Sequence, residues 1–287
     1  MAEDSAYKNG VWGICSKNGD VIQQLYAFLI SDFYTYFIFI TACSWGVGTR
    51  PQIRLDEEYL AFPVITNTDI MAELGVLAHK FLKPFREFYQ DDFVLGSPSK
   101  DKTTLDAINT KIEKLYSIKP YEKDLIDYVL KISRYQFQES KQSQITRKVQ
   151  SQEDILQQYV NVFISEFESL YTNEYLKADV YALDYFIAIN FVFQNEKPPS
   201  IINFVSDVTD EAAIFKILSN NISITKKVQN LYIQKDIKGF EANSFYIIKP
   251  NEYKCWHRAM AWYDVAEIKT AIEEAEIDHL IETWNVT

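Results

Sequence analysis

The chain has 287 residues, of which 47% are apolar and 24% charged, which suits a globular protein of one large or two smaller domains. Its formal net charge of -11 argues against a general nucleic-acid coat, because long-range attraction to phosphate needs positive potential, but a local basic surface remains compatible with it. The three cysteines are far apart and form neither a disulfide framework nor a metal-binding pattern, so we expect a reducing compartment, the cytoplasm.

An apolar run over residues 26–45 is about long enough to cross a bilayer. Asp32 lies near its middle and no basic residues flank it, and both features argue against a membrane span. We therefore predict a buried core helix that begins after an N-cap at Asp20, with a membrane segment as the alternative. Residues 52–55 then alternate between polar and apolar, which predicts a strand with one wet face.

The rest of the first half is predicted to be helical, since the chain has only 8 glycines and 8 prolines. A helix starts near 66–69 and continues with apolar spacing to Phe88, with an interruption or kink expected at Pro84. Apolar stripes predict two further helices, over 105–115 and 125–132.

A polar stretch, 139–152, is predicted to be an exposed linker or an extended helix, and it is the expected domain boundary. It divides the chain into a helical domain with short N-terminal strands, 1–138, and an α+β domain, 153–287. The fold class predicted for the whole chain is helix-rich α+β, with a helical first half and a smaller mixed α/β second half.

The second domain is predicted to begin with a long helix over 153–176. Short β-branched and aromatic runs predict strands, and a polar-capped pattern predicts the last helix, which starts with Asp264 as its N-cap. The predicted strands are 185–193, 201–205, 230–234 and 244–248, with a short helix over 211–218 and the last helix over 264–281.

No catalytic or cofactor-binding pattern stands out in the sequence. It lacks the phosphate-binding, dinucleotide-binding and nucleophile-elbow patterns, and its three histidines are isolated, so we expect neither a cofactor nor a metal. Glu241 followed by Lys249 is a loose candidate for a divergent metal-dependent nuclease, although solvated surface charge is the simpler interpretation of the acidic residues.

A first basic cluster, Arg50, Gln52 and Arg54, lies on one short segment after Trp45. Arginine pairs with guanine and glutamine with adenine, so these side chains are candidates for DNA contact. The alternative is a surface strand that forms salt bridges with the acidic residues 56–58.

A second basic cluster consists of Lys249, Asn251, Lys254 and Arg258, interleaved with aromatic residues such as Trp256. Alternating basic and aromatic side chains suit phosphate contact with stacking. The alternative is a turn whose aromatic residues pack on the core. If both basic clusters bind DNA, we expect them to share one surface.

Two regions of the chain carry patterns that occur together, and in this order, in one known family. They are 29–36, 41–46, 52–55 and 60–63 in the first region, and 245–251 with Trp256, Ala261 and Asp264 in the second. These segments resemble the C-terminal, target-recognition part of N6-adenine DNA methyltransferases from restriction-modification and phage-defence systems.

This resemblance implies DNA recognition beside a separate methyltransferase. The Asn/Asp-Pro-Pro-Tyr/Phe catalytic motif of that family is missing, because the stretch 197–200 has Lys and Ser at the flanking positions. The chain also lacks a glycine-rich S-adenosylmethionine loop. We therefore expect a non-catalytic subunit whose partners are duplex DNA and a methyltransferase or other defence-system subunit. A protein-binding scaffold without DNA contact is the alternative.

Overall fold

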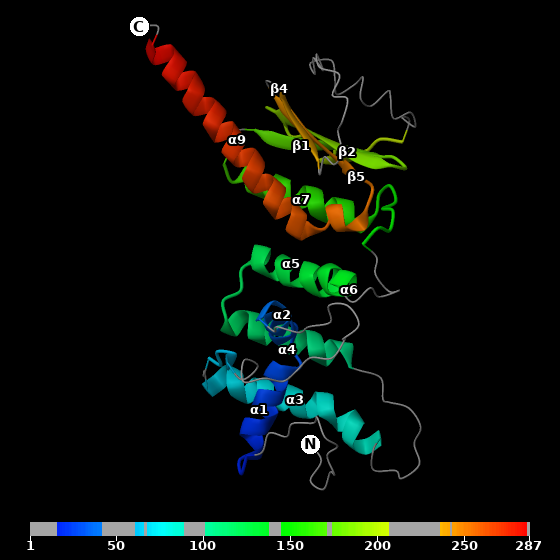
Figure 1. Ribbon diagram of the computed structural model, residues 1–287, viewed down its shortest axis with the longest axis vertical. Helices are drawn as coiled ribbons and strands as arrows, with labels where there is room; N and C mark the ends of the chain where they lie inside the picture. The colour runs from blue at the N-terminus through cyan, green and yellow to red at the C-terminus, as the bar shows by residue number, and fades with distance from the viewer. Residues whose placement is uncertain are drawn as a thin grey trace. The chain divides into compact units, whose positions relative to one another are not determined.

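The structure is a computed structural model, and it describes residues 16–41, 61–65, 68–88, 101–137, 145–170, 174–206, 236–241 and 243–285, with side chains of the last helix described to residue 275. The chain divides into two compact units, Met1–Lys141 and Gln142–Thr287. The described part of the first unit is helical, and the second combines helices with a sheet (Figure 1). The predicted helix-rich α+β fold with a helical first half is thus confirmed.

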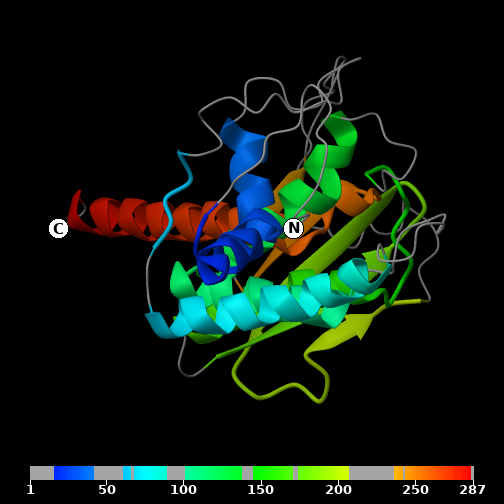
Figure 2. The same ribbon diagram turned by 90° about the horizontal axis from the view of Figure 1, so that it is seen from below.

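The described part of the first unit consists of helices and the short segment 61–65. α1 packs along α3, which in turn packs along α4 (Figures 1 and 2). In chain order the elements are α1 (Gly19–Leu29), α2 (Asp32–Thr41), α3 (Thr68–Phe88), α4 (Lys102–Leu115), α5 (Pro120–Tyr128), the π-helical turn η2 (Val129–Ser133) and α6 (Arg134–Phe137).

The apolar run predicted as one helix forms two, because the chain breaks at Ser31. Ser31 Oγ donates to the carbonyl of Phe28 at 2.7 Å and accepts from the N–H of Tyr34 at 3.1 Å, which ends α1 and caps α2. Among the described residues, no helix has both the length and the apolar character needed to cross a membrane.

Three local predictions in the first unit meet different outcomes. The N-cap of α1 is Asn18, not Asp20, since Asn18 Oδ1 accepts from the N–H of Asp20 at 3.0 Å. α3 continues through Pro84 to Phe88, so Pro84 does not interrupt it, while the kink expected as the other outcome stays a prediction. The predicted strand over 52–55 lies outside the described residues.

Aromatic rings dominate the core of the first unit. Phe62 is buried, and its ring centroid lies 5.1–6.2 Å from those of four aromatic side chains on α1 and α2: Phe28, Phe33, Tyr34 and Phe37. Tyr116, which follows α4, adds another ring at 5.7 Å. Phe62, from the segment 61–65, is thus the side chain around which the aromatic residues of α1 and α2 pack.

The second unit has a five-stranded sheet in the order β3-β1-β2-β5-β4. All neighbouring pairs are antiparallel except β1 and β3, which are parallel. The strands are β1 (Tyr175–Ala182), β2 (Phe186–Gln194), β3 (Ile202–Phe204), β4 (Ile237–Glu241) and β5 (Ser244–Pro250).

Two helices, α7 (Asp154–Glu168) and α9 (Arg258–Asn285), cover one face of this sheet (Figure 1). Alternate residues of β2, namely Ile187, Ile189 and Phe191, point into this core, as the two-residue period of a strand requires. Ala188 between them belongs to a smaller cluster with Tyr246 and Ile248 on the opposite face.

Several predictions for the second unit can be compared with these elements. The strands expected near 185–193, 201–205 and 244–248 are present as β2, β3 and β5. The helix predicted over 153–176 ends at Glu168, and its last residues begin β1, so that prediction is wrong there. The elements expected over 211–218 and 230–234 lie outside the described residues.

The last helix begins at Arg258, so Asp264 is not its cap but lies fully buried on its second turn. Ile268 is fully buried and Ile272 packs against the core, whereas 273–275 are exposed. The helix continues to Asn285, beyond the part of it that packs on the unit (Figure 1).

Part of the predicted linker is structured. Val149 is buried in the core of the second unit, and the carbonyls of Ile145 and Arg147 accept from the N–H groups of Lys254 and Tyr253. Residues 145–152 therefore belong to the second unit, and the boundary between the units falls earlier, at Lys141–Gln142.

Candidate functional site

Lys249, predicted to contact DNA, is instead the centre of a buried polar arrangement. Its side chain is 2% exposed, and its Nζ forms an ion pair with Asp264 of α9. Tyr159 of α7 donates its hydroxyl to Asp264 Oδ2 at 2.7 Å, and its ring centroid lies 5.4 Å from Lys249 Nζ. Burial lowers the pKa of Lys249, and the neighbouring Asp264 opposes that shift. The contacts of Lys249 therefore hold β5 to both helices and do not fit direct DNA contact.

A second lysine, Lys238 of β4, extends this arrangement toward the surface. Its Nζ lies 3.1 Å from Asp236 Oδ2 and 3.1 Å from Asp264 Oδ1, and it also pairs with Glu267. Burial alone would lower the pKa of Lys238, but the three carboxylates outweigh that effect and raise it above its ordinary value.

The carboxylates of Asp236, Asp264 and Glu267 are the described group with the spacing of a metal site, since one oxygen from each lies within 4.8 Å of the others. Oxygen ligands of this kind suit Mg²⁺ or Mn²⁺. However, the ammonium group of Lys238 lies among these oxygens and offsets part of their negative charge. A divalent cation would fit here only if that ammonium group moved aside.

Asn251, the next predicted DNA-contact residue, is also buried, at 7% exposure. Its Oδ1 accepts from the N–H of Val149 at 2.7 Å, and its Nδ2 donates to the carbonyls of Leu183 at 2.6 Å and Val149 at 3.2 Å. Its own N–H donates to the carbonyl of Tyr185 at 2.9 Å. One amide side chain thus ties together three segments that are distant in the sequence.

Around Asn251 these three segments carry a set of side chains that we call the basic junction: Arg147, Lys148, Tyr185 and Lys254. Lys148 is 53% exposed, lies 3.4 Å from Asp184 and places its Nζ 5.4 Å from the centroid of Tyr185. Lys254 is 34% exposed and pairs with Glu252 at 2.6 Å.

Arg147 is the most firmly held side chain of the basic junction. Its guanidinium donates to both carboxylate oxygens of Glu153, at 2.6 and 3.0 Å, and lies 4.6 Å from the ring centroid of Tyr253. These contacts fix its orientation and leave it less available to a ligand than Lys148.

The other predicted site residues fall in different places. Lys254 reaches the surface, while Arg258 is half-buried at the first position of α9. Arg50, Gln52 and Arg54, like Trp45, lie outside the described residues, so their part in DNA binding stays a prediction. Glu241, the loose nuclease candidate, is exposed at the end of β4, away from the buried Lys249.

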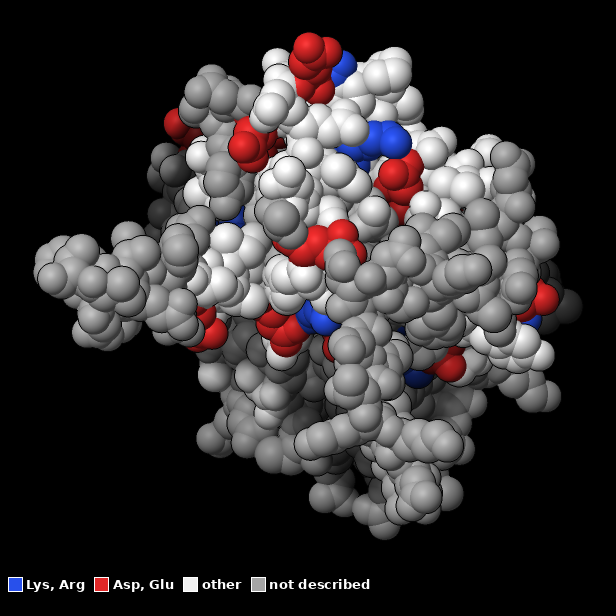
Figure 3. Space-filling view, turned by 90° about the horizontal axis from the view of Figure 1, so that it is seen from above, with Lys and Arg blue, Asp and Glu red and all other residues white. Residues whose placement is uncertain are grey.

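Acidic and basic side chains alternate on the face shown in Figure 3. The described lysines and arginines there stand among aspartates and glutamates and form no continuous basic area. On this face, therefore, the described surface offers no broad electropositive patch for duplex DNA.

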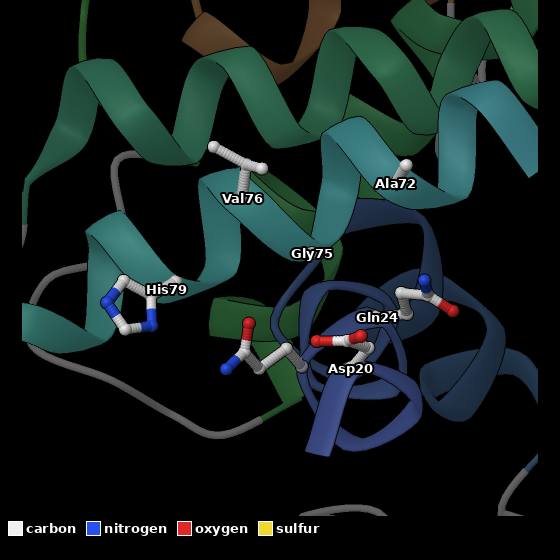
Figure 4. Close-up of a pocket in the computed structure, with 7 residues that line it drawn as sticks. Asp20, Gln24, Ala72, Gly75, Val76 and His79 are labelled. Atoms are coloured by element: carbon white, nitrogen blue, oxygen red, sulfur yellow. The ribbon is translucent and has the colours of Figure 1, made fainter. Parts of the chain in front are cut away.

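The first unit has a hollow of about 370 Å³ between α1 and α3. It is lined by polar side chains from α1, including Asp20 and Gln24, and by Gly75, Val76 and His79 of α3 (Figure 4). Asp20 is its sole carboxylate, and His79 belongs to no described group with metal-site spacing. The hollow does not define a catalytic arrangement.

Compared with known protein families, with curated proteins and with solved structures, the chain gives no match. What it does must therefore be argued from its own residues.

Sequence reasoning missed Arg147, Lys148 and Tyr185. The first two lie in a segment predicted to be a linker, and Tyr185 was assigned to a strand, whereas it lies exposed in the turn before β2. Contacts between segments far apart in the sequence bring these residues to the segment 251–254, among them the bonds of Asn251 to Val149 and Leu183 that span 102 and 68 positions. No local sequence pattern reveals such contacts.

Proposed function

We propose that this chain is a DNA-recognition or accessory subunit of a restriction-modification or related defence system. In this proposal it acts beside a separate methyltransferase and has no catalytic role in methylation.

The observation that supports this proposal is the burial of side chains in the segment 245–264, which carries the second region of the resemblance. In the second region of the resemblance to methyltransferases, Lys249, Asn251, Trp256, Ala261 and Asp264 are buried, whereas Pro250 is exposed. Each of these buried residues packs or bonds within the second unit, as when Trp256 Nε1 donates to the carbonyl of Pro250 at 3.0 Å. The pattern therefore describes how this part of the chain folds, which is what a target-recognition module would share with its relatives.

The test is fluorescence anisotropy with a fluorescein-labelled, random-sequence duplex, with and without the separate methyltransferase that this proposal requires, which would be sought among the products of the neighbouring genes. We expect binding that weakens strongly between about 50 and 200 mM salt, because phosphate contacts release counterions. An absence of binding under both conditions would remove the proposal. A stable complex with a partner protein in which neither component binds DNA would favour a protein-binding scaffold instead.

A divergent metal-dependent nuclease is the second candidate, because Asp236, Asp264 and Glu267 gather beside two lysines. The full-length protein would be incubated with supercoiled plasmid in Mg²⁺ or Mn²⁺. This candidate requires cleavage that EDTA stops and that Glu267→Gln abolishes, while Glu241→Gln leaves it intact. Plasmid that stays supercoiled in both metals would exclude it.

A further inference from the structure

Three segments meet at one end of the sheet in the second unit: 145–149, the turn 183–185 between β1 and β2, and 251–254. Backbone bonds join the first to the third, since Tyr253 donates to Arg147 at 2.8 Å and Lys254 donates to Ile145 at 3.2 Å. Asn251 joins both of them to the turn. The side chains displayed by these segments are therefore held in fixed relative positions.

The two lysines of this surface differ in how firmly they are paired. Lys148 and its partner Asp184 have side chains 53% and 83% exposed and are 3.4 Å apart, and ion pairs this exposed contribute little energy in water. A phosphate group can therefore take the place of Asp184 at small cost. Lys254 is 34% exposed and pairs more closely with Glu252, at 2.6 Å, so a phosphate would compete with that carboxylate for the ammonium group.

Tyr185 is the most exposed large side chain among the described apolar and aromatic residues, at 77%. Lys148 lies over its ring, but the high exposure leaves aromatic surface available. An exposed ring beside lysines is the combination that binds nucleic acid strands, with the ring stacking on a base and the lysines contacting phosphates. In an intact duplex the faces of the bases are covered by their neighbours, so such a ring favours an unpaired base.

We propose that the basic junction is the DNA-contacting surface of the second unit. Lys148 and Lys254 contact phosphates, and Tyr185 stacks on an unpaired base of a single-stranded or locally opened DNA. Asn251 is a positioning residue that holds the three segments together. This inference rests on the proposed function and names the form of DNA that this surface takes.

The experiment measures anisotropy of the full-length protein with three labelled probes of one sequence: a single strand, a duplex, and a duplex with one bulged base. The wild-type protein should bind the single strand and the bulged duplex about tenfold more tightly than the duplex, because stacking one base contributes about 1–3 kcal/mol.

Two variants separate the roles of the side chains. Tyr185→Leu should lose the preference for unpaired bases and keep duplex affinity. The double variant Lys148→Gln/Lys254→Gln should weaken binding to all three probes and lower the salt dependence for the duplex by about 2 in slope, close to one for each lost phosphate contact.

Matched controls lie at the other end of the β1–β2 hairpin: Tyr175→Leu, and Lys197→Gln in the turn after β2. Both should bind every probe as the wild type does, and circular dichroism would verify that all variants fold. If the double lysine variant binds the probes as tightly as the wild type, the basic junction is not the DNA-contacting surface. The proposed function would then stand, with DNA bound elsewhere on the protein. A wild-type protein that binds none of the probes, alone or with its partner, would remove both.

Discussion

Different kinds of interaction stabilise the interiors of the two units. In the first, the buried core is mostly aromatic and aliphatic, and Phe62 contacts a ring of aromatic side chains. In the second, Lys249, Asn251, His257 and Asp264 are buried together with the apolar core. Ring packing tolerates exchange between shapes of similar volume, whereas buried polar groups require particular partners. The second unit should therefore tolerate substitution less well than the first. The positions most sensitive to substitution should be its buried polar residues between Lys249 and Asp264.

The largest expected effect tests this difference directly. Asp264→Ala leaves the ammonium of Lys249 buried without its carboxylate, which should cost about 3–5 kcal/mol in the free energy of unfolding. Urea denaturation with hydrogen–deuterium exchange would assign the loss to the second unit. Asp184→Ala, which removes an exposed carboxylate of the same unit, serves as the control and should have almost no effect. A tolerated Asp264→Ala would show that the buried pair does not hold this unit together.

The second-largest effect is expected at Asn251, whose side chain bonds to Val149 and Leu183. Asn251→Leu keeps the branched shape of the side chain but leaves the N–H of Val149 and the carbonyl of Leu183 without their bonds, at a cost of about 1–3 kcal/mol. Faster amide exchange in 145–149 and 183–185 should accompany it. Asn195→Leu in the exposed turn after β2 is the matched control. Unchanged exchange in both segments would mean that other contacts hold them.

In the first unit, Phe62→Leu should cost only about 1–1.5 kcal/mol, because the aromatic surroundings can close around a smaller apolar side chain. Its effect should stay within the first unit in hydrogen–deuterium exchange. Val76→Ala, at an exposed position of α3, provides the baseline. A loss as large as that of Asp264→Ala would contradict the contrast between the two units.

The smallest effect depends on pH. The hydrogen bond from Arg147 holds the pKa of Glu153 below its ordinary value of 4.5. Because the pKa is lower in the folded protein, the stabilisation is fully present above pH 4.5 and is lost as the pH falls through the folded pKa. Glu153→Gln should remove about 0.5–1 kcal/mol at neutral pH and show a shallower loss of stability in acid. Urea titrations at neutral and acidic pH would measure both; identical acid profiles would rule out this pair as a source of acid sensitivity.

The sequence predicted the elements whose signal is local. The β-branched and aromatic run of β2 and the turn after it are visible without any structure. β1 was missed because its alternating residues, Leu176, Ala178 and Val180, directly follow an amphipathic helix that sets a different period.

The site residues were harder to predict for a physical reason. Lys249 and Asn251 follow the predicted strand 244–248 in a segment rich in charge, and such residues usually face water. Their burial depends on Asp264, Val149 and Leu183, which come from other elements, so composition alone could not reveal it. The alternative stated for that cluster, a turn whose aromatic residues pack on the core, describes Trp256 well, since it is fully buried.

The length of α9 has a mechanical consequence. Ile272 packs on the core, 273–275 are exposed, and the helical backbone continues for about 20 Å beyond Ile272, to Asn285. A tilt of about 10° at the packed base would move the far end by about 3–4 Å, as a lever magnifies a small rotation at its pivot. Asp264 holds the start of the helix through Lys249 and Lys238. A change in this polar arrangement that tilts the helix would therefore produce its largest displacement at the far end of the helix.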